Sequence, residues 1–159
     1  SRKVGDQYYA MVSPVMIDAK NPLYSVNGVF NAIFIHGNVL GDAMFYGSGA
    51  GKLPTASAVV ADVVDCAKNK GRNIMMSWSE EKLDLLQIDD VKSRFFVRVS
   101  GHAAERQSEI EELFGKVEIV AVPSLSEEFA FITGEITEQE YREKAEKLDG
   151  IQSRIRARI

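Results

Sequence analysis

The stretch that decides the fold is RFFVRVS, residues 94–100, in which apolar and polar side chains alternate. Phe95, Val97 and Val99 share one face of an extended chain, which is typical of a strand with one buried face. The same alternation returns in IQSRIRARI, residues 151–159. Two amphipathic strands at the two ends of one segment predict a sheet that the intervening residues complete.

Between these strands the sequence predicts a helix, two strands and a second helix. Residues 105–114 carry apolar side chains at helical spacing and end at a glycine, and TEQE at 137–140 has the spacing of a capping box that opens a helix. Apolar runs at 117–122 and 128–132 indicate strands. The order β-α-β-β-α-β is the ferredoxin-like split βαβ, in which the first and last strands are neighbours. Five arginines are then expected on one sheet face: Arg94, Arg98, Arg154, Arg156 and Arg158.

Composition divides the chain into two segments. The whole chain has 159 residues, a net charge of −4 and 45% hydrophobic residues, which is ordinary for a globular protein. Eight of the 12 glycines lie in residues 1–71, a weakly charged and apolar segment, whereas residues 72–159 carry most of the charge. We therefore predict an α+β protein with domains at 1–71 and 92–159, joined by a linker at 72–91.

The first segment reads as β-rich with one buried helix. Apolar runs at 8–16, 29–35 and 43–46 predict strands, the first of them interrupted by a proline that favours an edge or a bulge. A helix is expected over 55–70, with Thr55 as its N-cap. Because this helix is apolar nearly all round, burial on most of its sides is predicted.

Several function classes are disfavoured by composition. The acidic balance argues against nucleic-acid or membrane-surface binding, which needs a basic surplus. A single cysteine, Cys66, excludes a disulfide framework, and His36 and His102 suggest neither a metal site nor an acid-base pair. The uncharged run at 21–41 is broken by turn residues and is not read as a membrane helix. The N-terminus lacks a signal-peptide core, so a cytoplasmic location is the default expectation.

The glycine-rich stretch GSGAG at 47–51 is the main candidate for a ligand contact. It lies between a predicted strand and a predicted helix, where bare backbone and helix-start amides favour anions. Its spacing matches neither the dinucleotide fingerprint nor a phosphate-cradling loop. Spacing alone therefore favours a tight structural turn, and no catalytic set emerges from the residues.

Residues 21–69, with FNAIF, MFYG, GAG and LPTASAVVADVV, closely resemble the C-terminal part of the homoserine dehydrogenase catalytic region. That family interconverts L-aspartate 4-semialdehyde and L-homoserine with NAD or NADP, in threonine, methionine and isoleucine synthesis. The resemblance implies a C-terminal fragment without catalytic residues, inactive alone and binding no cofactor by itself. It also implies that 8–16 and 29–35 belong to a dimerisation sheet, and hence a homodimer or higher homo-oligomer.

The resemblance gives GSGAG a role that spacing does not. It assigns cofactor contacts to Gly47, Gly49, Ala50 and Gly51, although the family usually has proline where this chain has Ser48. The second segment resembles an ACT domain, which implies regulation by an amino acid such as threonine. Where such domains often carry Pro-Gly, this chain has GHAAE at 101–105. The alternative interpretation is a stand-alone, non-enzymatic ligand-sensing or dimerisation module.

Overall fold

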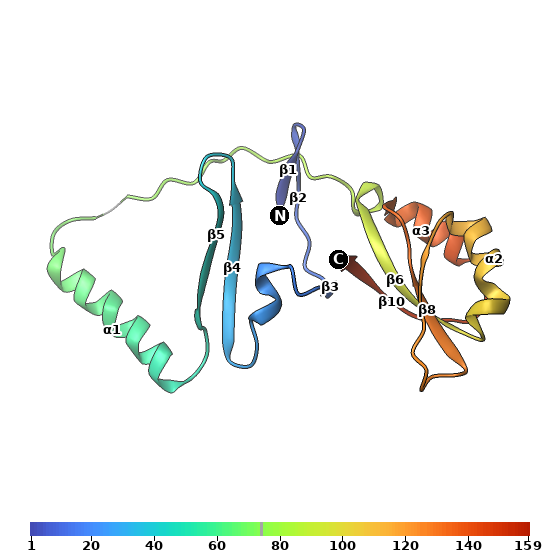
Figure 1. Ribbon diagram of the computed structural model, residues 1–159. Helices are drawn as coiled ribbons and strands as arrows, with labels where there is room; N and C mark the ends of the chain where they lie inside the picture. The colour runs from blue at the N-terminus through green and yellow to red at the C-terminus, as the bar shows by residue number, and fades with distance from the viewer. Residues whose placement is uncertain (74) are drawn as a thin grey trace. The chain divides into compact units, whose positions relative to one another are not determined.

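The computed structural model describes residues 1–73 and 75–159, and the chain forms two compact units (Figure 1). One unit combines residues 1–18 with 82–159, and the other contains 19–81. The compact units therefore do not divide where the composition changes, because the first eighteen residues pack with the C-terminal part. The domain boundaries inferred from the sequence stay a prediction.

The C-terminal unit is built on an antiparallel sheet in the strand order β10-β6-β8-β7. The predicted order of elements is confirmed, and the first and last strands are neighbours. A short strand, β9, also pairs with β6. The elements are β6 (Lys92–Ser100), α2 (Ala103–Phe114), β7 (Glu118–Val120), β8 (Glu128–Ile132), β9 (Ile136–Thr137), α3 (Glu138–Ala145) and β10 (Ile151–Arg158).

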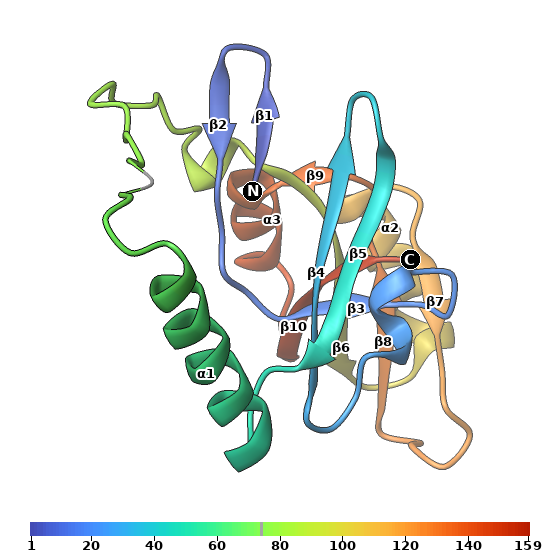
Figure 2. The ribbon, with the colours of Figure 1, turned by 90° about the vertical axis from the view of Figure 1, so that its left-hand side faces the viewer.

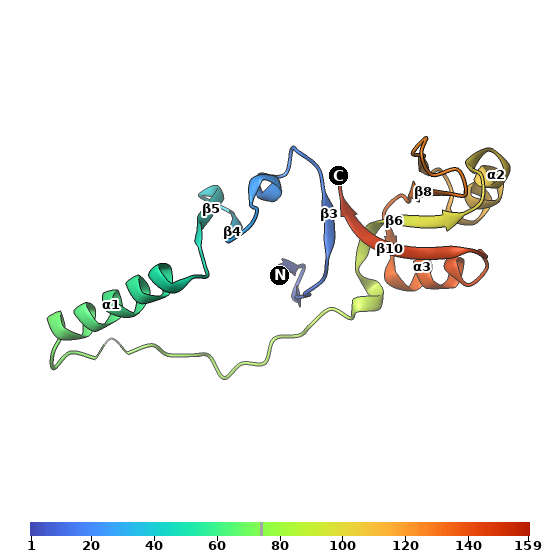
Figure 3. The same ribbon diagram turned by 90° about the horizontal axis from the view of Figure 1, so that it is seen from below.

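The predicted strand over 8–16 is wrong, because this region contains parts of two short strands with different partners. The elements are β1 (Arg2–Val4), β2 (Gln7–Tyr9) and β3 (Val15–Ile17). β2 pairs with β1, whereas β3 adds to the outer side of β10 as a parallel strand (Figure 3). The change of partner comes just after Pro14, which has no amide hydrogen to give to a ladder.

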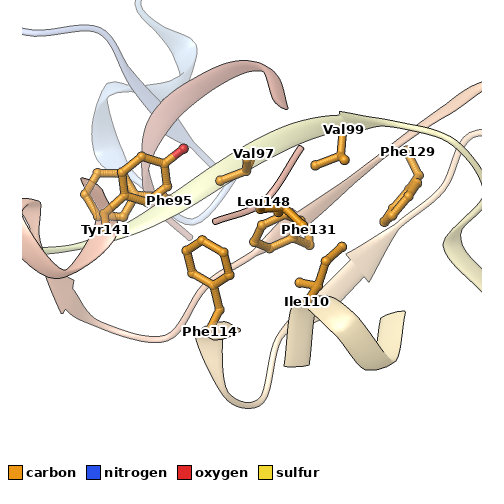
Figure 4. Packing of buried hydrophobic residues seen from close by; sticks show 9 residues of the cluster. All are labelled: Phe95, Val97, Val99, Ile110, Phe114, Phe129, Phe131, Tyr141 and Leu148. Atoms are coloured by element: carbon orange, nitrogen blue, oxygen red, sulfur yellow. The ribbon is translucent and has the colours of Figure 1, made fainter. Parts of the chain in front are cut away.

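Helices α2 and α3 lie on one side of the sheet, behind it in Figure 2. The alternating side chains of β6 point towards them, and Phe95, Val97 and Val99 are fully buried as predicted. Aromatic rings fill the space between the layers: Phe95 lies 4.5 Å from Tyr141 between centroids. Figure 4 shows the cluster formed by Phe95, Val97, Val99, Ile110, Phe114, Phe129, Phe131, Tyr141 and Leu148.

The predicted common face of Arg94, Arg98, Arg154, Arg156 and Arg158 is wrong. A register shift near the start of β10 moves its later residues by one position relative to β6. Arg154 consequently lies opposite Val97, and Arg156 lies opposite Phe95, on the side of the sheet that the helices cover. Strand alternation places Arg158 with them. A one-residue shift exchanges the two faces of a strand, and spacing within β10 alone does not reveal it.

The capping box predicted at the start of α3 is confirmed. The Glu140 amide donates to Oγ1 of Thr137 at 3.1 Å, and the Thr137 amide donates to Oε2 of Glu140 at 2.8 Å. The backbone hydrogen bond from Thr137 is the largest of the effects that lower the pKa of the Glu140 carboxyl. A carboxyl whose pKa is lowered by folding stabilises the fold when ionised.

Replacing Thr137 with alanine is expected to lower the free energy of unfolding of the C-terminal unit by about 1 kcal/mol.

The capping carboxyl of Glu140 makes this stability depend on pH. Because folding lowers the pKa of Glu140, the stability that its carboxylate contributes is present above the unfolded carboxyl pKa and is lost as the pH falls through the folded value. Urea denaturation of wild type and Glu140→Gln between pH 7 and pH 3 tests this. Between pH 7 and pH 3, the free energy of unfolding should fall less in Glu140→Gln than in wild type. Ser108→Ala, at an exposed position of α2, is the control for Thr137→Ala and should change little.

The second unit contains a β-hairpin followed by a helix. Its elements are the 3-10 helix η1 (Pro22–Ser25), β4 (Phe30–Gly37), β5 (Gly41–Ser48) and α1 (Lys52–Lys68). β4 and β5 pair without interruption from Phe30 opposite Ser48 to Gly37 opposite Gly41. The predicted strands at 29–35 and 43–46 are thus confirmed and extended.

Helix α1 differs from its prediction in where it starts and in its surroundings. It begins three residues before Thr55, with Gly51 as N-cap, and the Thr55 amide donates to the Gly51 carbonyl at 3.1 Å. No side chain of α1 is buried, so the prediction of a buried helix is wrong. The apolar side chains of α1 would be stabilised by burial against other residues, but none of them is buried by the residues that the structure describes. No helix among them is long and apolar enough to span a membrane.

Candidate functional site

The glycine-rich loop, residues 47–51, connects β5 to α1, so its predicted position between a strand and a helix is confirmed. Gly47 lies one pair before the end of the hairpin ladder, opposite Asn31. Ser48 is the last residue of β5, and Gly51 caps α1. The four residues assigned by resemblance, Gly47, Gly49, Ala50 and Gly51, therefore lie on one exposed stretch that runs from the end of β5 to the start of α1.

The glycines of this loop have different surroundings. A Cβ on Gly49 would clash with Nδ2 at the end of the Asn31 side chain on β4, which would have to move aside. Gly51 has a φ of +118°, which other residues rarely adopt. A Cβ on Gly47 would meet nothing within 4 Å. The backbone conformation requires glycine at Gly51, a side chain at Gly49 would displace that of Asn31, and Gly47 leaves bare backbone facing open space.

The helix start that follows the loop favours an anion. No side chain caps α1, and its first turn contains no acidic residue. The first amides of a helix lack intrahelical acceptors, and their dipoles add to a partial positive charge. Lys52 begins the helix and adds a full positive charge, while Pro54 removes one donor. Bare backbone, free amides and a lysine together suit the phosphate-bearing part of a nucleotide cofactor.

The histidines and the cysteine noted in the sequence do not form an acid-base set at the glycine-rich loop. The expectation that His36 lacks a partner is wrong, since its Nδ1 lies 2.5 Å from Oδ1 of Asp42 across the hairpin. The sequence could have indicated this pair, because a hairpin turn at 37–41 places residues 36 and 42 opposite each other. His102 is the N-cap of α2 and Cys66 is exposed. No group of metal-ligating side chains occurs among the described residues.

A second glycine-dependent turn joins β6 to α2 in the C-terminal unit. Gly101 has a φ of +102°, and its amide donates to the Glu127 carbonyl at 2.9 Å. Arg106 closes the turn by donating from Nη1 to the Ser100 carbonyl at 3.0 Å. Gly150 lies against the same place, where a Cβ would approach Oγ of Ser100 to 2.4 Å. The sequence indicated Gly101 as a turn residue and Gly150 as the end of the second predicted helix, but not that Gly150 packs against Ser100.

The comparisons with known proteins point to one family. Residues 1–64 match the family model described as homoserine dehydrogenase. A homoserine dehydrogenase of Lactococcus lactis is 42% identical over 94 residues, covering 57% of this chain and 22% of the relative. One of Corynebacterium glutamicum is 54% identical over 61 residues, covering 38% of this chain and 14% of the relative. The chain thus spans less than a quarter of the length of these two relatives.

The fold also has a counterpart among solved structures. The crystal structure of a homoserine dehydrogenase from Thiobacillus denitrificans matches 99% of this chain with a TM-score of 0.75. The match covers 40% of that chain at 24% sequence identity, so it shows the fold alone. The mixed α+β architecture therefore agrees with the sequence relationship. The chain is homologous to the C-terminal region of homoserine dehydrogenases.

Proposed function

We propose that the chain is the C-terminal part of an NAD(P)-dependent homoserine dehydrogenase and supplies part of its cofactor site. The observation that carries this is the glycine-rich loop in the segment that matches the family, with open space at Gly47. When bound, the nicotinamide would accept a hydride from the alcohol carbon of L-homoserine, which becomes L-aspartate 4-semialdehyde as its hydroxyl loses a proton, or would return the hydride in the reverse direction. The backbone of residues 47–51 and the start of α1 bind and orient the cofactor. The residues that move the proton lie outside this chain, which is inactive alone.

Replacing Gly47 with valine tests the loop without disturbing the fold. The position tolerates a side chain, so the added methyls should obstruct the cofactor and leave β5 intact. In the protein that includes the upstream coding sequence, we expect KM for the nicotinamide cofactor to rise at least about tenfold, which corresponds to about 1.4 kcal/mol of lost binding. Homoserine oxidation followed by nicotinamide absorbance measures it.

Gly134→Val is the matched control, because a Cβ there also meets nothing within 4 Å and the position lies in the C-terminal unit. It should leave KM unchanged. Equal KM values for the two variants would remove the loop from the cofactor site. Absence of turnover with both NAD and NADP in the wild-type protein would overturn the proposed enzyme.

We further propose that the C-terminal unit is an ACT-type regulatory domain that binds an amino acid such as threonine. Its support is the strand order β10-β6-β8-β7 with two helices on one face, and the glycine turn at Gly101. The 101–105 connection lacks the Pro-Gly that such domains often carry. Gly101 nevertheless provides a turn with a positive φ at the equivalent connection.

Titration calorimetry on the 159-residue chain tests amino-acid binding. Threonine is expected to release or absorb heat with a saturable curve and to raise the melting temperature, because a ligand that binds only the folded state stabilises it. D-threonine is the control and should give neither effect. A folded sample with no heat and no thermal shift would remove threonine as the effector.

The same proposal makes the protein a homodimer or a higher homo-oligomer. Its support is the exposure of large apolar side chains on the hairpin, including Ile33 and Phe45. Surfaces of this kind commonly mark protein–protein contacts. Sedimentation velocity should give at least a dimer, and a monomer across the micromolar range would contradict it.

A further inference from the structure

We propose that a groove between α3 and β10 binds a zwitterionic α-amino acid. The site rests on the proposed regulatory function, for which it names the place and the class of ligand. The groove has a volume of about 510 Å³, and ligand pockets in proteins commonly measure about 300–1,000 Å³. None of the residues that line it belongs to the 101–105 connection. Its lining includes Tyr141, Arg142, Ala145, Glu146, Ile151 and Arg154.

The register shift in β10 shapes this groove. Ile151 lies opposite Val99. Arg154 lies opposite Val97, and both valines are buried in the core under the helices. Because directly opposite residues of an antiparallel pair share a face, Ile151 and Arg154 are both on the side of α3. Three residues apart in a regular strand, they would face opposite sides. The shift thus brings an apolar and a cationic side chain together, and such irregularities are frequent beside active sites.

The outer edge of β10 beside the groove offers backbone hydrogen bonds. β3 pairs with residues 156–158 of this edge. In the part of the chain that the structure describes, residues 151–155 have β6 as their only strand partner. Amide and carbonyl groups that point away from β6 at these positions are therefore left for a ligand. The ammonium and carboxylate groups of an amino acid can donate to and accept from such an edge.

The charged side chains of the groove have the two signs that a zwitterion requires. Arg142 is 58% exposed and donates from Nη2 to Asp89. Arg154 is 39% exposed and donates from Nη1 to Glu138. Since a guanidinium has five N–H donors, both arginines keep donors for the carboxylate of a ligand. Glu146 supplies the opposite charge, which suits an ammonium group.

Glu146 has a position that helix stability does not explain. It is the C-cap of α3, where the partial negative charge of the helix end favours cations over carboxylates. Its side chain is exposed and forms no hydrogen bond or ion pair with the residues described by the structure. A residue that breaks a local rule in this way often belongs to a functional site. Ala145 and Ile151, which also line the groove, suit an aliphatic side chain such as that of threonine or isoleucine.

Titration calorimetry on the 159-residue chain tests the site with L-threonine, L-isoleucine and L-methionine as separate probes. For an amino acid that binds wild type, Glu146→Gln is expected to raise Kd at least about tenfold, because the ammonium group loses its charged partner. Arg142→Gln should raise Kd for the amino acid, whereas the amide of that amino acid, which lacks the carboxylate, should bind wild type and Arg142→Gln equally weakly. Glu143→Gln is the matched control, since Glu143 is exposed on the same helix and does not line the groove.

The outcomes separate this site from the regulatory function on which it rests. Binding with the same Kd in Glu146→Gln and Glu143→Gln would overturn the groove and leave an amino-acid-binding unit with its site elsewhere. No binding of any of the three amino acids to a folded wild-type chain would overturn both proposals. Both substitutions change exposed side chains, so weaker binding to Glu146→Gln at an unchanged melting temperature would support the groove.

Discussion

Truncation of Phe131 to alanine is expected to be among the most destabilising single changes in the C-terminal unit, lowering its free energy of unfolding by about 3–5 kcal/mol. Phe131 is fully buried, and its ring centroid lies 5.2 Å from that of Phe114 on α2. The side chain therefore joins the central sheet to the helix layer (Figure 4). Its loss would remove apolar burial and leave a cavity that the rigid sheet cannot close.

Amide exchange of β6 and β8 measures this effect for the C-terminal unit separately. Both strands should lose protection together, because they share one core with α2. Leu125→Ala is the control, since Leu125 is 48% exposed and lies outside the helices and strands. A loss no larger than that of the control would mean that the ring contributes little to the core.

The C-terminal unit was predictable because its signals are local. Alternation in β6, the glycine after α2 and the capping box at Thr137 each act over a few residues, and all three agree with the structure. The faces of β10 were not predictable, because the register shift depends on pairing with β6. The partner of β3 lies about 140 residues away in sequence. Spacing within the N-terminal segment carries no information about it.

The glycine-rich loop shows a similar limit. The sequence placed it correctly between a strand and a helix, but it did not reveal that the hairpin brings the side chain of Asn31 beside Gly49. The strand–glycine–helix pattern alone is common to structural turns and ligand loops. The family resemblance, rather than spacing, singled out its role, and that role stays a prediction.

Helix α1 marks where composition and structure diverge. Its sequence is apolar nearly all round, yet every one of its side chains is exposed to some degree, including Val59 and Val63. The apolar composition of α1 predicts that its surface is to be buried, but it does not indicate which residues bury it. The C-terminal unit, in contrast, builds its core from its own elements.

A charge cluster around a buried carboxylate beside that core gives the second large prediction. Glu138 begins α3 and is 4% exposed, and its carboxylate forms ion pairs with Arg154 and Arg156. Nη1 of Arg154 donates to Oε2 at 2.8 Å, and its guanidinium stacks on Tyr141 at 4.6 Å from the ring centroid. An acidic residue suits the start of a helix. One carboxylate thus joins α3 to β10 and compensates two arginines turned to the helix side by the register shift.

Replacing Glu138 with glutamine keeps the shape but removes the charge. The two arginines would then lose their counter-ion next to the core, at an expected cost of about 2–3 kcal/mol, reduced from the fully buried case because Arg154 is partly exposed. Urea denaturation measures it. Glu128→Gln is the control, because it breaks the more exposed pair with Arg98 and should cost below about 1 kcal/mol.

Replacing all three charged residues with apolar ones tests whether the cluster contributes to the stability of the fold or only to how its elements are arranged. A triple variant, Glu138→Leu with Arg154→Met and Arg156→Met, removes all the charges, and such replacements are often neutral or stabilising. We therefore expect it to be at least as stable as wild type, although Glu138→Gln alone is not. That pair of results would mean that the desolvation cost of the three charges offsets their attraction. The cluster would then determine how β10 packs against α3 without adding net stability. A triple variant as unstable as Glu138→Gln would instead make the ion pairs themselves a net source of stability.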